Sequence, residues 1–365
     1  MKQKMKRWLL AAGICGCALL AGALPVSAEP APANITTQMT MKEIRENPGI
    51  VGSGIATYDK SDGDIRLVRR LNENKTLLEY AGTPQAEDCA AALNLAIENY
   101  NRGVQVTWQL YSPEEIAEDP SLGAAQLYYF PAEQPDAKYV LTIGGNGDIK
   151  TGVMGEAMSV VPELHEKGYT VFVLRHRIFM DAGDDAPMQD AKAALKLIND
   201  HAEQFGVQRE DYALLGFSSG GQILSLLASE NEQYGCRSIG VQPPAALLLA
   251  YPVNDFYELK PVYAAVMDTG NLGRRFYWLN ISDVVTAGFP PTYYWCSRGD
   301  VILSLVNWEA QCPVLEEALT RAGVPHKGVY YDGVPHAVGT AHGTAAEGWL
   351  EKAIAFWESY MKNKT

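Results

Sequence analysis

The sequence predicts a doubly wound α/β fold, in which a mostly parallel sheet carries helices on both of its faces. Two observations from residue 104 onward support this prediction. Short and almost wholly apolar runs recur along the chain, as is typical of strands buried on both faces. Helix-length amphipathic segments separate most of these runs, as the crossover connections of parallel strands require. We find no repeat of solenoid period in the sequence.

The first 28 residues have the layout of a secretory signal peptide. The start is basic, an apolar run begins at Trp8, and small residues precede an expected cleavage after Ala28. The apolar run is short and Pro25 interrupts it, which disfavours a membrane anchor. The stretch "ICGC" loosely resembles a lipid-attachment box, so a lipoprotein formed through Cys17 is the less favoured alternative.

Residues 29–103 are predicted to form an N-terminal extension that is partly helical. Its opening, "EPAPANITTQ", is rich in Pro and Ala and predicts a flexible lead-in. Residues 86–103 form an amphipathic pattern, because apolar side chains recur at helical spacing from Cys89 to Tyr100 and Gly103 ends the pattern. We expect this helix to pack on the main domain.

The main domain, residues 104–365, is predicted to hold the sheet. Two first runs, "VQVTWQLYS" and "AQLYYFP", can pair with each other. Further strands are expected at residues 139–143, 170–175, 212–217, 246–252, 292–296 and 327–331. Helices are expected near residues 153–167, 189–205, 220–229, 308–322 and 346–361.

Composition excludes several classes of partner. The formal net charge of −13 argues against binding to nucleic acid or to an anionic membrane. The sequence contains no zinc-protease, phosphate-loop or dinucleotide motif, so no metal or cofactor is predicted. Cleavage after residue 28 would leave four cysteines, for which three disulfide pairings stay open: Cys89, Cys236, Cys296 and Cys312.

Ligands of such a sheet bind beyond the carboxyl ends of its strands. The expected strand at 212–217 runs into "GFSSGG", where Gly216, Ser218 and Gly220 form a G-x-S-x-G pattern. A sharp turn from strand to helix exposes the hydroxyl of the central serine and leaves room only for glycine two residues before it and two residues after it. The pattern alone is weak, but its position between a strand and a helix makes Ser218 a candidate nucleophile.

A nucleophilic serine needs a base, and the base needs a carboxylate that orients it. Asp300 follows the expected strand at 292–296, and His336 follows the next strand. Both residues fall at the carboxyl edge, in the chain order serine, acid, histidine. Asp255 stays open as an alternative acid and His342 as an alternative base.

An oxyanion hole is expected after the strand at 139–143, where the chain reads "GGNG". Glycine at such a turn lets backbone N–H groups approach a tetrahedral intermediate. We expect donors from Gly145, Asn146 and Ser219. An ordinary connection between a strand and a helix would use glycines in the same way, and is the alternative.

The motifs "GGNG", "GYTVFVLRHRI", "PMQDAKAALKLI", "GFSSGGQ", "AYPV", "SRGD" and "PHAVG" together resemble the α/β-hydrolase superfamily. The resemblance is greatest to its acetyl-esterase and bacterial feruloyl-esterase-like branch, over about residues 104–361. It implies the nucleophile, acid and base at Ser218, Asp300 and His336. Asn146 replaces a glycine of the family and Gln222 a histidine, and these departures bear on the substrate.

The expected function is therefore a secreted serine carboxylesterase that hydrolyses short-acyl or aryl esters, with carbohydrate esters among the candidates. A serine peptidase of the same fold and a non-catalytic binding protein are the alternatives. The stretch 255–285 predicts a short flap over the site. Its aromatic and basic residues suit a sugar or an aryl group better than a fatty chain: Arg274, Arg275, Phe276 and Trp278.

Overall fold

A computed structural model describes residues 30–56, 72–145, 152–178, 185–255, 279–305 and 307–361. The predicted signal peptide, Asn146 and most of the expected flap lie outside these residues. Ala31–Thr365 form one compact unit, so the extension and the main domain pack together.

The described residues form one eight-stranded sheet, with the strand order β1-β2-β4-β3-β5-β6-β7-β8. β2 runs antiparallel to β1 and β4, and all the other neighbouring strands are parallel. The strands are β1 (Thr107–Gln109), β2 (Gln126–Phe130), β3 (Tyr139–Ile143), β4 (Thr170–Arg175), β5 (Ala213–Phe217), β6 (Ala246–Ala250), β7 (Thr292–Arg298) and β8 (His326–Asp332). The predicted strands and the mostly parallel sheet are confirmed.

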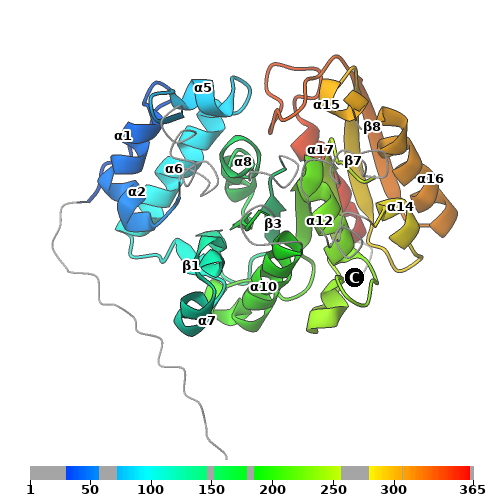
Figure 1. Cartoon of the computed structure of the whole chain (residues 1–365), viewed down its shortest axis with the longest axis horizontal. Coiled ribbons are helices and arrows are strands. Elements are labelled where there is room, and N and C mark those ends of the chain that lie inside the picture. Colours follow the sequence, from blue (N-terminus) through cyan, green and yellow to red (C-terminus); the bar gives the residue numbers. More distant parts are fainter. Residues whose placement is uncertain are drawn as a thin grey trace, which may run out of the picture. The chain divides into compact units, whose positions relative to one another are not determined.

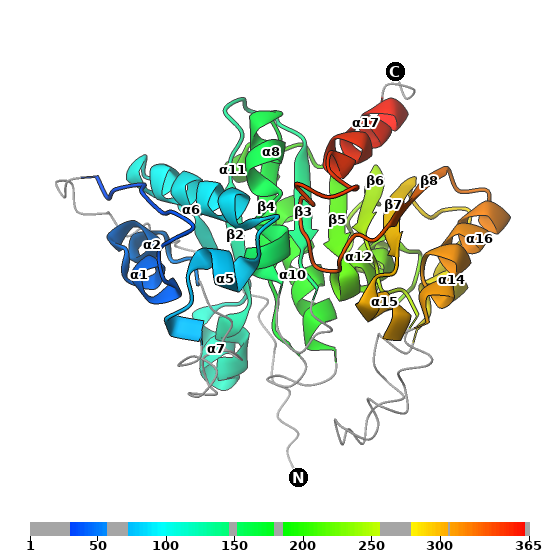
Figure 2. The same ribbon diagram turned by 90° about the horizontal axis from the view of Figure 1, so that it is seen from above.

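Helices cover both faces of this sheet (Figures 1 and 2). One face carries α10 (Ala186–Asp200), α12 (Ser218–Ala228), α14 (Ile281–Val284) and α16 (Cys312–Ala322), which contact one another in series. The other face carries α6 (Ala86–Asn101), α8 (Val161–Glu166) and α17 (Trp349–Met361). Shorter elements are α7 (Pro113–Glu118), η1 (Pro120–Ala124), η2 (Val153–Ala157), α11 (Ala202–Phe205), η3 (Cys236–Ile239), α15 (Val301–Leu305) and η7 (Trp308–Ala310).

Three of the predicted helices are divided in the structure. The segment predicted at 153–167 forms η2 and α8, and the segment at 308–322 forms η7 and α16. Pro162 and Pro313 lie in the first turns of α8 and α16, where the missing N–H of proline has no helical partner to lose. The helix predicted at 189–205 begins earlier, at Ala186, and is interrupted before α11.

The extension is more ordered than its sequence predicts. In addition to α6, it contains α1 (Met41–Glu46), α2 (Pro48–Ser53) and α5 (Leu77–Ala81). Capping boxes begin α1 at Thr40 and α5 at Thr76, and this T-x-x-E signal could have located both helices. Ile35 lies within the stretch predicted to be a flexible lead-in, but it is buried. Its N–H donates to the Asn94 Oδ1, and its carbonyl accepts from the Asn94 Nδ2.

A buried ion pair joins the end of β4 to α10. Arg177 and Asp190 are 3% and 0% exposed, and the Arg177 Nη2 donates to the Asp190 Oδ1 over 2.8 Å. The Arg177 N–H and the Tyr111 hydroxyl donate to the same carboxylate. Such a pair fixes the two elements relative to each other, since a buried charge must keep its partner.

One disulfide is formed among the described cysteines, between Cys296 of β7 and Cys312 of α16. It ties the strand that precedes Asp300 to the helix that packs on it. Cys89 and Cys236 are buried free thiols, and burial raises the pKa of both.

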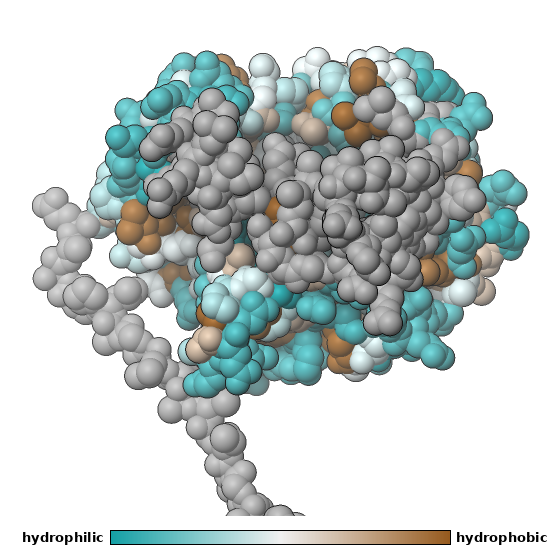
Figure 3. Space-filling view, viewed as in Figure 1, coloured by the Kyte–Doolittle hydropathy of each residue, from teal (hydrophilic) through white to brown (hydrophobic). Residues whose placement is uncertain are grey.

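The face drawn in Figure 3 is mostly hydrophilic where its residues are described, and its hydrophobic residues form small separate groups. Among the helices of the described residues, none combines the length and the apolar character that a membrane crossing requires.

Candidate active site

The candidate site begins at the turn between β5 and α12. Ser218 is the first residue of α12 and has a φ of +50°, in the left-handed region that non-glycine residues seldom adopt. A Cβ on Gly216 would lie 2.7 Å from the Gly221 Cα, and one on Gly220 would lie 2.6 Å from the Gly144 oxygen. Gly216 and Gly220 are therefore required by close backbone approach, and the strained turn presents Ser218 at the carboxyl edge of the sheet.

Ser218, His336 and Asp300 form one hydrogen-bonded chain. The His336 Nε2 lies 2.8 Å from the Ser218 Oγ, and its Nδ1 lies 2.7 Å from the Asp300 Oδ2. Asp300 is fully buried, and its Oδ1 accepts from the N–H groups of Ile302 and Leu303 over 2.9 and 3.0 Å. These bonds fix the carboxylate, which in turn fixes the imidazole with its Nε2 toward the serine. This is the geometry that a general base needs.

The two alternative residues have other contacts. The Asp255 N–H donates to the Gln311 Oε1, and its carbonyl accepts from the Gln311 Nε2, so its backbone is bound to the start of α16. His342 is half-exposed, with its Nε2 3.2 Å from the Asp88 Oδ2. The structure therefore brings together the first-choice acid and base of the sequence prediction.

The predicted oxyanion donors have different surroundings. A Cβ on Gly145 would lie 2.4 Å from the Ser218 Cβ, so only glycine allows this approach to the serine. The Gly145 N–H, however, donates to the Glu156 Oε2 over 2.7 Å and points to that carboxylate in this arrangement. Ser219 is buried in the first turn of α12, where backbone N–H groups face the helix start. Asn146 lies outside the described residues.

Two further residues, not predicted from the sequence, contact residues of the site. Glu156, in η2, is 2% exposed, and its carboxylate accepts a hydrogen bond from the Gly145 N–H. The Tyr251 ring lies 4.8 Å from the His336 ring, between centroids, and its hydroxyl accepts from the Gly339 N–H over 3.1 Å. Burial and the nearby Glu156 carboxylate raise the pKa of Tyr251 well above its ordinary value, so its hydroxyl stays protonated. Tyr251 directly follows β6, and this position at the carboxyl end of a strand could have identified it from the sequence as a residue of the site.

Gln222, the second departure from the family pattern, is fully buried in α12. Its Nε2 donates to the Leu279 carbonyl over 3.0 Å. Gln222 thus bonds to the first described residue after position 278.

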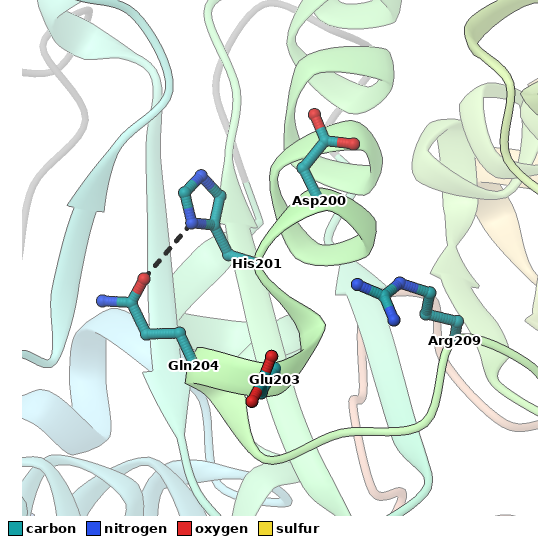
Figure 4. A pocket seen from close by; sticks show the side chains of 5 residues that line it. All are labelled: Asp200, His201, Glu203, Gln204 and Arg209. Carbon is teal, nitrogen blue, oxygen red and sulfur yellow. Dashed lines mark hydrogen bonds between the residues drawn. The ribbon is translucent and has the colours of Figure 1, made fainter. Parts of the chain in front are cut away.

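A separate polar hollow lies around α11 (Figure 4). It is lined by Asp200, His201, Glu203, Gln204 and Arg209. The hollow lies around α11, which precedes β5, whereas Ser218 follows β5. The His201 Nδ1 lies 3.2 Å from the Gln204 Oε1, and the lining of the hollow does not include Ser218, His336 or Asp300. Among the described residues, no cluster of three His, Cys, Asp or Glu side chains could hold a metal ion.

This strand order, with a serine turn after β5 and an acid and a histidine after β7 and β8, defines the α/β-hydrolase fold. Comparisons agree. Residues 126–257 match the family model BD-FAE. An acetylxylan esterase of Xylanibacter ruminicola is 26% identical over 132 residues, which cover 36% of this chain and 26% of the relative.

Solved structures show the same fold. An acetyl ester-xyloside bifunctional hydrolase from Caldicellulosiruptor lactoaceticus aligns with a TM-score of 0.55 and 21% identity, over 70% of this chain and 95% of that one. An inhibited esterase B from Lactobacillus rhamnosis aligns with a TM-score of 0.56 and 19% identity, over 71% and 87%. The resemblance to the esterase branch of the α/β-hydrolases is thus confirmed. The match spans about a quarter of the length of the curated relative.

Proposed function

We propose that the protein is a serine carboxylesterase. The Ser218 Oγ attacks an acyl carbonyl while His336 accepts its proton, which His336 then gives to the leaving alcohol. Water, activated by the same imidazole, releases the acid from the acyl-enzyme. Asp300 holds the imidazole tautomer and stabilises its charged form. The observation that carries this proposal is the hydrogen-bonded chain from Ser218 through His336 to Asp300.

The oxyanion of the tetrahedral intermediate would be bound by backbone N–H groups of Asn146 and Ser219. Ser219 follows the nucleophile at the start of α12, where the helix dipole also favours negative charge. Gly145 contributes by its missing side chain, which leaves the space beside Ser218 open. The bond from Gly145 to Glu156 would hold the start of the oxyanion turn in place.

The proposed substrates are short-acyl or aryl esters, with carbohydrate esters among them. The names of two similar proteins support this class, one an acetylxylan esterase and the other an acetyl ester-xyloside bifunctional hydrolase. The aromatic and basic residues of the stretch 255–285 favour the same class.

We also propose that the protein is exported and that cleavage follows Ala28. Support comes from the basic start, the apolar run and the small residues before that position. N-terminal sequencing of protein recovered from the producing cells tests it. A mature chain that begins at Glu29 supports the proposal, an intact Met1 contradicts it, and a lipid-modified Cys17 supports the alternative.

Two assays separate the proposed esterase from its alternatives. A fluorophosphonate probe should label the purified protein, whereas a non-catalytic binding protein would not react. Turnover of p-nitrophenyl acetate and of acetylated sugars is then compared with turnover of aminoacyl p-nitroanilides. We expect ester hydrolysis, and faster cleavage of the amides would assign a peptidase instead.

A further inference from the structure

The loop that carries His336 has an unusual backbone. We call residues 333–348, between β8 and α17, the histidine loop. Ala337 and Ala341 have φ values of 58° and 60°, although neither is glycine. Left-handed conformations of this kind cost free energy and persist only where the surroundings enforce them. The position of the imidazole therefore depends on what holds this loop.

The N-terminal extension supplies part of that hold. The Gln85 Nε2 donates to the Ala337 carbonyl over 2.9 Å, directly after the catalytic histidine in the chain. Gln85 is 3% exposed and precedes α6. Asp88 of α6, three residues after Gln85, accepts a 2.6 Å hydrogen bond from the hydroxyl of Thr340 in the histidine loop. In Figures 1 and 2 the turn between α5 and α6 lies beside the histidine loop.

The main domain holds the same loop from its other side. The Tyr251 hydroxyl accepts from the Gly339 N–H, and the Trp349 Nε1 donates to the Gly339 carbonyl over 3.0 Å. A Cβ on Gly339 would lie 2.4 Å from the Ser159 Oγ and 3.2 Å from the Gln85 Cβ. The loop is thus enclosed between the extension and the elements that form the site, with little space to shift.

We propose that Gln85 and Asp88 are positioning residues for the catalytic base, so that the extension is a working part of the active site. This inference rests on the proposed function. The Nε2 of His336 must stay within hydrogen-bond distance of the Ser218 Oγ, and a displacement of about 1 Å can cost about 10²-fold in rate. Neither the family-model match nor the superfamily motifs include these two residues, since the match begins at residue 126.

The test uses the full-length protein and the variants Gln85→Glu and Asp88→Asn. Gln85→Glu keeps the shape of the side chain, removes the donor to the Ala337 carbonyl and places a carboxylate oxygen against it. We expect kcat to fall about 10- to 100-fold while KM changes little, because the substrate contacts remain. Each kcat is expressed per site titrated with fluorophosphonate, so unfolded molecules are not counted. Glu98→Gln is the matched control, since Glu98 is an exposed carboxylate near the other end of α6.

A second readout separates positioning from general support of the fold. The proton between the His336 Nδ1 and the Asp300 Oδ2 is expected to give a low-field proton NMR resonance. Gln85→Glu should shift or broaden this resonance, and Glu98→Gln should leave it as in the wild type. Asp88→Asn and Thr340→Val should show coupled losses in kcat in a double-mutant cycle, because the first weakens the bond, by replacing the carboxylate with a neutral amide oxygen, and the second removes its donor.

Wild-type kcat per titrated site in both Gln85→Glu and Asp88→Asn, with an unchanged low-field resonance, would overturn the inference. If Gln85→Glu does not fold, Asp88→Asn and Thr340→Val decide by the same two readouts. A wild-type protein that fluorophosphonate does not label refutes the proposed function instead. The NMR comparison then still shows whether the extension holds the pair of His336 and Asp300.

Discussion

The His336 Nε2 lies 2.8 Å from the Ser218 Oγ, and this contact joins residues 118 positions apart in the chain. Two strands, β6 and β7, lie between the strands that the two residues follow. The contact exists because parallel strands bring their carboxyl ends to one edge of the sheet.

The nucleophile is tested by two neighbouring serines. Ser218→Ala should lower kcat on p-nitrophenyl acetate by a factor on the order of 10⁶, because the members of a triad act as a unit. Ser219→Ala should keep most of the activity, since its backbone N–H remains. Steady-state kinetics of the two variants are the measurement. An inactive Ser219→Ala with an active Ser218→Ala would move the nucleophile by one residue.

The base is tested by two histidines. His336→Ala should abolish turnover, while His342→Ala should keep it, because His342 is half-exposed and its nearest carboxylate is Asp88. Acidification should also abolish wild-type activity, since a protonated imidazole cannot accept the serine proton. The rate of ester hydrolysis is followed across pH for each protein. Loss of turnover in His342→Ala alone would transfer the role of base to that residue.

The buried ion pair is tested through stability. Asp190→Asn leaves the charge of Arg177 buried beside a neutral amide, and should lower the free energy of unfolding by about 3–5 kcal/mol. Asp200→Asn is the control, because its pair with Lys196 is exposed and should contribute less than about 1 kcal/mol. Urea unfolding of both variants gives the values. Equal, small losses would show that the pair does not fix β4 to α10.

The acyl pocket is tested by chain length. We expect higher kcat/KM for acetyl and butyryl p-nitrophenyl esters than for the palmitoyl ester, because the proposed site suits short acyl groups. Each methylene that a pocket accommodates adds roughly 0.8 kcal/mol, so chain length reports its depth. A kcat/KM that rises steadily from acetyl to palmitoyl would assign a lipase.

Much of the fold could be predicted because its strands carry strong local signals. Buried parallel strands such as 139–143 and 213–217 are continuous apolar runs, and the residues that follow them must lie at the ligand-binding edge. Ser218, Asp300 and His336 could therefore be preferred from the G-x-S-x-G pattern, position and chain order, while Asp255 and His342 stayed open as alternatives.

The remaining features depend on contacts between distant segments. The helices α1, α2 and α5 are too short for helical periodicity to reveal, and short helices are stabilised mainly by packing, although the capping boxes of α1 and α5 were a local signal for those two. The bond from the Gly145 amide to Glu156 joins the turn after β3 to η2, and the bond from Gln85 to Ala337 spans 252 residues. No local pattern encodes such pairs. The pairing of Cys296 with Cys312 was equally open, because spacing does not select among connectivities.

The most direct test of the proposed esterase locates its covalent adduct. The wild-type protein is reacted with a fluorophosphonate, digested, and analysed by peptide mass spectrometry alongside Ser218→Ala. The proposal predicts a single modified peptide containing residues 216–221, with the phosphonyl group on the Ser218 Oγ and no adduct in the variant. An adduct on any other residue, or an equal adduct in Ser218→Ala, would contradict the proposed mechanism.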